Sequence, residues 1–85
     1  MKLLFAEDEV SMAEAVTDIL TYHNYTVDTV YDGADALDYA RAEQYDGIIL
    51  DIMMPKKSGL EVLKTLRSEG NTTPILLLTA KAEVE

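Results

Sequence analysis

Residues 47–51 read GIILD, an almost wholly apolar run that ends on the carboxylate Asp51. Runs without polar alternation are typical of parallel strands that are covered on both faces. Residues 2–6 read KLLFA and have the same character, and Glu7 and Asp8 follow them directly. If the two runs are neighbouring parallel strands, their carboxyl ends lie side by side and the three acids converge on one spot.

Acids gathered in this way repel one another unless a cation lies between them. Hard divalent ions such as Mg²⁺ take oxygen ligands, commonly one or two carboxylates together with waters and substrate phosphate. The sequence therefore predicts a Mg²⁺ site formed by Glu7, Asp8 and Asp51 at the carboxyl edge of a sheet, with phosphate chemistry as its natural use. Asp51 alone could instead be an ordinary strand-end acid. Glu7 and Asp8 could also cap the helix expected from about Val10, since acids favour helix N-termini.

The remaining segments alternate between helical and extended patterns. Apolar spacing predicts helices over about 10–22, from Asp32-Gly33 to about residue 42, and from a capping box at Ser58 to just before Gly70. Residues 26–30 predict a less buried edge strand, and residues 74–78 a fourth strand. The order βαβαβαβ predicts an α/β fold, a doubly wound parallel sheet in which strands 2–6 and 47–50 are central and adjacent.

Size and charge narrow the function classes. The 85 residues allow one domain at most, and 48% hydrophobic residues are ordinary for a soluble globular chain. A net charge of −9 argues against binding nucleic acid or an anionic membrane, both of which attract basic proteins. The absence of cysteine excludes disulfides and thiolate metal sites and fits a cytoplasmic protein.

Four segments together match one family. Residues 2–9 (KLLFAEDE) provide a strand followed by acids, and residues 51–60 (DIMMPKKSGL) place a proline four and a glycine eight positions after Asp51. Residues 32–37 (DGADAL) open the second helix, and residues 79–80 (TA) follow the fourth strand. In this order the chain resembles the receiver domain of bacterial two-component response regulators over nearly its whole length.

The resemblance implies a flavodoxin-like sheet of strand order 2-1-3-4 and a role for each site residue. Asp51 would be the phospho-acceptor, with Mg²⁺ bound by Asp8, Asp51 and the backbone carbonyl of Met53. Glu7 would hold a metal-bound water, where the family usually has an aspartate. Thr79 would be the switch hydroxyl that bonds the phosphoryl group, although a threonine also suits a strand end on propensity alone.

The resemblance also implies that the domain, residues 1–85, is incomplete at its C-terminus, at about two-thirds of a full receiver. A full receiver has five strands and five helices, so the last helix-strand-helix would be lacking. With it would go the lysine that contacts the phosphoryl group, because Lys81 comes too soon after Thr79. The fourth strand would then be an exposed apolar edge, which predicts a homo-oligomer or a complementing fragment.

Two functions follow from these expectations. The first is a phospho-acceptor signalling domain that receives its phosphoryl group from a sensor histidine kinase. The second is a self-associating scaffold without phosphotransfer. Neither is an enzyme beyond its own phosphorylation and dephosphorylation. An aspartyl-phosphate hydrolase would need a second acid two residues after Asp51, where this chain has Met53.

Overall fold

The computed structural model describes residues 1–78 and contains the predicted alternation of strands and helices in this part of the chain. The bounds of the strands and helices are β1 (Lys2–Ala6), α1 (Val10–Tyr22), β2 (Thr26–Val30), α2 (Gly33–Ala42), β3 (Gly47–Asp51), α3 (Gly59–Ser68) and β4 (Ile75–Leu78). The predicted ranges 10–22 and 26–30 are confirmed. The fourth strand begins one residue later than predicted, at Ile75 rather than at Pro74.

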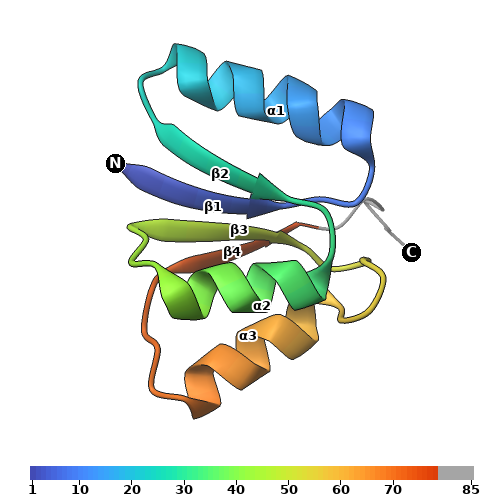
Figure 1. Ribbon diagram of the computed structural model, residues 1–85, viewed down its shortest axis with the longest axis vertical. Coiled ribbons are helices and arrows are strands. Elements are labelled where there is room, and N and C mark those ends of the chain that lie inside the picture. The colour runs from blue at the N-terminus through green and yellow to red at the C-terminus, as the bar shows by residue number, and fades with distance from the viewer. Residues whose placement is uncertain (79–85) are drawn as a thin grey trace, which may run out of the picture.

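The four strands form one parallel sheet in the order β2-β1-β3-β4, as predicted. The two apolar runs of the sequence, β1 and β3, are the central strands, and the more polar β2 lies at one edge. Ala6 pairs in register with both Val30 and Leu50, so the central strands end at the same level. All carboxyl ends therefore point to one edge of the sheet, on the right in Figure 1.

Helices cover the sheet from both sides, with α1 on one side and α2 and α3 on the other (Figure 1). The main core lies between the sheet and the α2–α3 pair. Its buried strand and helix residues are Leu4, Ala6, Val30, Ala36, Leu37, Ala40, Tyr45, Ile48, Leu50, Val62 and Leu66. Each fully buried Leu, Ile or Val side chain stabilises the fold by about 1.5–3 kcal/mol, so this layer supplies most of the hydrophobic stabilisation.

The α1 face is much less well covered. Apolar spacing predicts one apolar face on α1, but Ala13 is its only buried residue, whereas Met12 is 52% and Ile19 58% exposed. On the wholly apolar β4, Leu76 is 57% and Leu78 37% exposed. Of the three helices within residues 1–78, only α1 lies on this side, and it packs over β1 and β2. No element within the described residues therefore covers the face of β3 and β4 beside it.

Each helix begins at a residue whose side chain caps it. Asp32 precedes α2 and accepts the Asp35 N–H at 2.8 Å. Ser58 and Glu61 exchange hydrogen bonds at the start of α3, which confirms the predicted capping box. A missing N-terminal cap typically costs about 1 kcal/mol, so these side chains fix where α2 and α3 start. None of the described helices has the length and hydropathy needed to cross a membrane.

Candidate functional site

The three predicted acids lie together at the carboxyl edge of the sheet. One carboxylate oxygen each from Glu7, Asp8 and Asp51 lies within 4.8 Å of the other two. Glu7 and Asp8 follow the last residue of β1, and Asp51 is the last residue of β3. Their convergence follows from the parallel pairing of these two neighbouring strands, as the sequence predicts.

Two of the three carboxylates are buried. Glu7 is 6% exposed; its backbone N–H donates to the Val30 carbonyl at 3.1 Å, and its Oε2 accepts the Glu9 N–H at 3.0 Å. Asp51 is 4% exposed, and its Oδ1 accepts the Met53 N–H in a long bond of 3.3 Å. Asp8 is exposed. The cluster is thus a buried pair of acids with a third acid facing solvent.

The electrostatics of the cluster are unfavourable without a cation. Burial raises the pKa of the Glu7 carboxyl, the Glu9 N–H lowers this pKa, and the nearby charges of Asp51 and Asp8 raise it further. In the part of the chain that the structure describes, no Lys or Arg forms an ion pair with any of the three acids. Burial and neighbouring negative charges both disfavour the ionised form of a carboxyl group, so binding of a cation or a proton stabilises this site.

The spacing of the oxygens suits one small divalent ion. An Mg²⁺–oxygen bond is about 2.1 Å long, so two ligands on opposite sides of the ion are about 4.2 Å apart. The limit of 4.8 Å among the three acids lies close to this value. Met53 is 63% exposed, and among residues 1–78 no group donates a hydrogen bond to its carbonyl oxygen. These residues therefore fit the Mg²⁺ site that the resemblance implies.

The alternative role of Glu7 and Asp8, capping the first helix, belongs to Glu9. Its Oε1 accepts the Met12 N–H at 2.8 Å, and Glu9 is the N-cap of α1. Sequence reasoning missed Glu9 because three successive acids precede the helix and each could have capped it. Since Glu9 satisfies the helix end, Glu7 and Asp8 remain available at the sheet edge.

The loop after Asp51 is tied to the sheet and to α3. The Ile52 N–H donates to the Leu78 carbonyl at 2.8 Å, and the Gly59 N–H donates to the Ile52 carbonyl at 2.9 Å. Asp51 pairs in register with Leu78, so β4 ends beside the acids. The predicted switch residue Thr79 lies outside the described residues.

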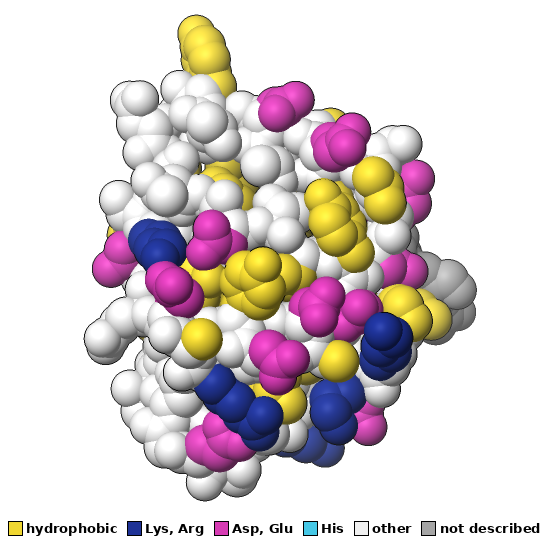
Figure 2. Space-filling model, viewed as in Figure 1, with side chains coloured by type: hydrophobic (Ala, Val, Ile, Leu, Met, Phe, Trp, Pro, Cys, Tyr) yellow, Lys and Arg dark blue, Asp and Glu magenta, His cyan; other side chains and the backbone are white. Residues whose placement is uncertain are grey.

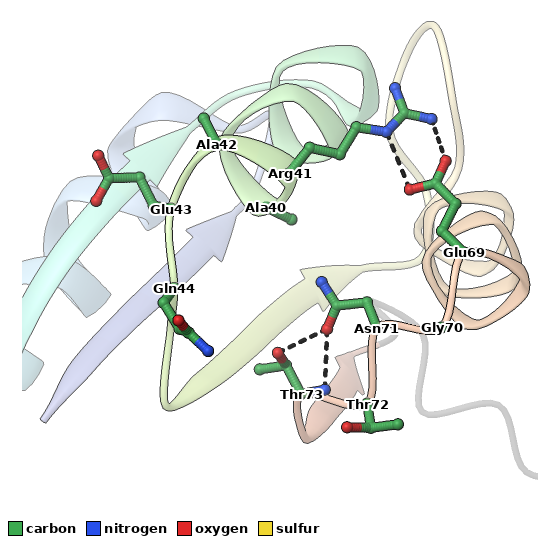
Figure 3. A pocket seen from close by; sticks show the side chains of 10 residues that line it. All are labelled: Ala40, Arg41, Ala42, Glu43, Gln44, Glu69, Gly70, Asn71, Thr72 and Thr73. Atoms are coloured by element: carbon green, nitrogen blue, oxygen red, sulfur yellow. Dashed lines mark hydrogen bonds and ion pairs between the residues drawn. The ribbon is translucent and has the colours of Figure 1, made fainter.

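A separate hollow of about 540 Å³ lies at the opposite, amino edge of the sheet (Figure 3). It is lined by the segments 40–44 and 69–73. Arg41 and Glu69 pair across it, and Asn71 Oδ1 accepts the N–H and the hydroxyl of Thr73. Its charged side chains have partners of opposite charge, Arg41 with Glu69 and Glu43 with Lys2, so this hollow lacks the converging like charges that distinguish the acid cluster.

Comparison with known proteins identifies the family. The model of the response regulator receiver domain matches residues 3–85. The chain is 51% identical over 83 residues to the transcriptional regulatory protein DltR of Streptococcus agalactiae, and 45% identical over 82 residues to the response regulator ArlR of Staphylococcus aureus. These matches cover 98% and 96% of this chain but 37% of each relative, so the chain spans little more than a third of their length.

Solved structures agree with this assignment. The receiver domain of the Francisella response regulator 1452 superposes with a TM-score of 0.93 at 30% identity, over 98% of this chain and 69% of that one. The response regulator TrrA from Thermotoga maritima, solved in complex with Mg(2+)-BeF, gives 0.89 at 37% identity, over 95% and 70%. That residues 1–85 are an incomplete receiver stays a prediction. The chain belongs to the family of response regulator receiver domains.

Proposed function

We propose that this chain is a phospho-acceptor domain that takes a phosphoryl group onto Asp51 from a sensor histidine kinase, with Mg²⁺ bound at the acid cluster. Receiver domains of response regulators are signalling modules that interact with such kinases and bind Mg²⁺ at an acidic pocket. The observation that carries the proposal is the convergence of Glu7, Asp8 and Asp51 within 4.8 Å, with no basic partner among the described residues. TrrA, solved with Mg(2+)-BeF, supports the same reading.

The chemistry follows from the position of Asp51. Its carboxylate oxygen attacks phosphorus, an oxygen–phosphorus bond forms, and the phosphorus–nitrogen bond to the kinase histidine breaks with the electron pair leaving on the imidazole. Asp8, Asp51 and the Met53 carbonyl would hold Mg²⁺, with Glu7 binding one of its waters. Bound Mg²⁺ offsets negative charge on the transferring group. Asp51 is 4% exposed whereas Asp8 is exposed, so of these two acids Asp8 is the one that solvent reaches freely.

The role proposed for Thr79 is to read the phosphorylated state. Its hydroxyl would donate a hydrogen bond to a phosphoryl oxygen on Asp51. In support, Leu78, the residue before it in sequence, pairs in register with Asp51 at the end of β4. Thr79→Ala should leave Asp51 labelling intact but remove the spectroscopic response of the domain to it, whereas Thr79→Ser, which keeps a hydroxyl, should preserve that response.

Incubation with acetyl phosphate and Mg²⁺ tests the function. Intact-mass and peptide analysis should show one added phosphoryl group on the peptide that contains Asp51. Asp51→Asn should take up none, because an amide is not a nucleophile at neutral pH. The matched control Asp38→Asn, which removes an exposed acid from α2, should label like the unaltered chain. Labelling of Asp51→Asn, or no labelling of the folded unaltered chain, would contradict the proposal.

A second candidate function, self-association, rests on the open α1 face. Leu3, Ile49 and Leu76 line an apolar hollow of about 220 Å³ beside β4, which is an edge strand within residues 1–78. Apolar side chains on a strand with unpaired backbone groups favour pairing with another chain. We propose that a second copy of this chain, or a fragment that completes the sheet, covers this face.

Sedimentation velocity distinguishes this candidate. The unaltered chain should sediment as a dimer or larger species, and Leu76→Glu should shift it to a monomer. The control Tyr39→Ser removes a comparably exposed side chain from α2 and should leave the oligomer unchanged. A compact monomer at all concentrations would eliminate self-association and leave the phospho-acceptor role untouched.

A further inference from the structure

The start of α2 docks onto the loop that follows Asp51. The Gly33 N–H donates to the Pro55 carbonyl at 3.3 Å, although the two residues are 22 positions apart in sequence. Lys56 Nζ lies 3.7 Å from Asp32 Oδ2, on the same carboxylate that caps α2. Residues 52–58 are therefore held by a helix that contributes no side chain to the acid cluster.

Only glycine fits at position 33. A Cβ atom there would overlap the backbone carbonyl of Lys57 and crowd the Lys57 Cβ. The overlap is with backbone, which cannot swing aside as the end of a long side chain can. Any side chain at position 33 would therefore push the loop, or the end of α2, out of place.

The docked loop carries a strained turn. Lys56 has a φ of 71°, and the Lys57 N–H donates to the Pro55 carbonyl at 2.8 Å, which closes a three-residue turn. Non-glycine residues with positive φ cost of order 1 kcal/mol or more and persist where surrounding contacts impose them. Here the Pro55 carbonyl accepts hydrogen bonds from both Lys57 and Gly33, so the docking contact and the strained turn share one acceptor.

We propose that Gly33 is a positioning residue for the cation site: by docking on Pro55 and Lys57, it fixes the loop backbone that carries Met53, two residues from Pro55. The Gly59 hydrogen bond to Ile52 already joins the two ends of this loop. Gly33 docks on the middle of the loop, at Pro55 and Lys57, which that bond leaves free. The inference rests on the proposed function only in taking the Met53 carbonyl as a Mg²⁺ ligand.

Gly33→Ala tests the proposal through Mg²⁺ binding, measured calorimetrically without any phosphodonor. Residues that orient metal ligands typically change affinity by about 10–100-fold, so we expect the Kd for Mg²⁺ to rise at least about tenfold. The rate of labelling by acetyl phosphate should need correspondingly more Mg²⁺ for half-saturation, while its plateau changes far less. A purely structural role would instead lower the Tm and leave the Kd of the folded protein unchanged.

Gly47→Ala is the matched control. It adds the same methyl group to a glycine at the amino end of β3, where the nearest atom is the flexible end of the Leu3 side chain at 3.3 Å. Its Mg²⁺ affinity should match that of the unaltered chain. Folded Gly33→Ala with unaltered Mg²⁺ affinity would overturn the inference while leaving phosphoryl uptake at Asp51 intact.

An NMR titration of the unaltered chain with Mg²⁺ keeps the proposal testable if Gly33→Ala does not fold. Because its N–H bonds to the Pro55 carbonyl, the Gly33 amide resonance should shift in step with that of Met53. The Gly47 amide should not move. A Gly33 resonance that stays in place while those of Asp8 and Met53 shift would refute the coupling.

Discussion

The two edges of the sheet differ in whether their acidic side chains have basic partners. At the amino edge, Arg41 bonds to Glu69 and Lys2 to Glu43, so acids and bases are paired. At the carboxyl edge, three acids converge without a basic partner among the described residues. Figure 2 shows acidic side chains across the face in view, with Lys and Arg beside only some of them. Each charge at the amino edge has a counter-charge, whereas repulsion among the three acids favours the binding of a cation or a proton.

Removing an acid should therefore matter far more at the carboxyl edge. Asp8→Asn takes a charged ligand from the proposed Mg²⁺ site, and we expect the Kd for Mg²⁺ to rise about a hundredfold, the upper end of what ligand-orienting residues contribute. Glu43→Gln removes one acid from the amino edge and should leave that Kd unchanged. Calorimetric titrations measure both Kd values. An equal rise in the Kd for Mg²⁺ in the two variants would contradict a cation site confined to the carboxyl edge.

The next largest effect concerns a buried contact near the amino edge. The Tyr45 hydroxyl donates to Asp28 Oδ2 at 2.6 Å, and Tyr45 is 6% exposed. A hydrogen bond to a charged group contributes about 1.5–3 kcal/mol, so Tyr45→Phe should lower the free energy of unfolding by roughly that amount. Denaturant unfolding measures this loss, and Tyr39→Phe, at an exposed position on α2, is the control.

The same contact predicts a dependence on alkaline pH. Burial, and then the hydrogen bond to Asp28, raises the pKa of the Tyr45 phenol. The phenol therefore ionises first in the unfolded chain, above about pH 10. Its contribution to stability is complete below that pH and declines as the pH rises further. Tyr45→Phe should lack this component of the decline, and an identical alkaline profile for both proteins would contradict the assignment.

Features that depend on local sequence patterns could be predicted, whereas features that depend on packing between distant segments could not. The spacing of apolar residues predicted the bounds of α1 and β2, and the apolar character of β1 and β3 predicted that they are the central strands. The convergence of Glu7, Asp8 and Asp51 followed, because parallel neighbours end at one edge. The exposure of Ile19 did not follow, since helical spacing shows which side of a helix is apolar but not what covers it.

The docking of Gly33 on the loop was equally beyond sequence reasoning. The pair Asp32-Gly33 indicated a helix start, and that is correct. Its approach to Pro55 depends on how closely two segments pack after the sheet has formed, and no local pattern encodes that distance. A positive φ at Lys56 was also unexpected, because lysine has no preference for that conformation.

A smaller change in stability is expected from Glu7→Gln, and it distinguishes charge repulsion within the acid cluster from Mg²⁺ binding by the cluster. Without Mg²⁺, Glu7→Gln removes two repulsive charge pairs, with Asp8 and with Asp51, and a pair about 5 Å apart is worth about 1 kcal/mol even in a water-like medium. The metal-free variant should therefore be more stable than the unaltered chain by at least about that amount, while its Tm rises less on adding Mg²⁺. Thermal unfolding in EDTA and in MgCl₂ measures both. Destabilisation in EDTA would show that Glu7 is held by contacts rather than strained by repulsion.

The smallest effect is expected from the exposed ion pair at the amino edge. Arg41 and Glu69 are both exposed, and surface pairs of this kind contribute little and are screened by salt. Arg41→Gln should barely change the Tm, and the remaining difference should vanish at high ionic strength. A large, salt-resistant loss of stability would mean that the amino edge depends on its charges more than its exposure indicates.

Paramagnetic broadening by Mn²⁺, which takes the same oxygen ligands as Mg²⁺, tests the shared cation most directly. At substoichiometric Mn²⁺, amide resonances next to Glu7, Asp8 and Asp51 should broaden first and together, and excess Mg²⁺ should restore them. Resonances of the segments 40–44 and 69–73 should stay sharp. Broadening centred on those segments, or spread evenly over all acidic residues, would contradict a single cation site at the carboxyl edge.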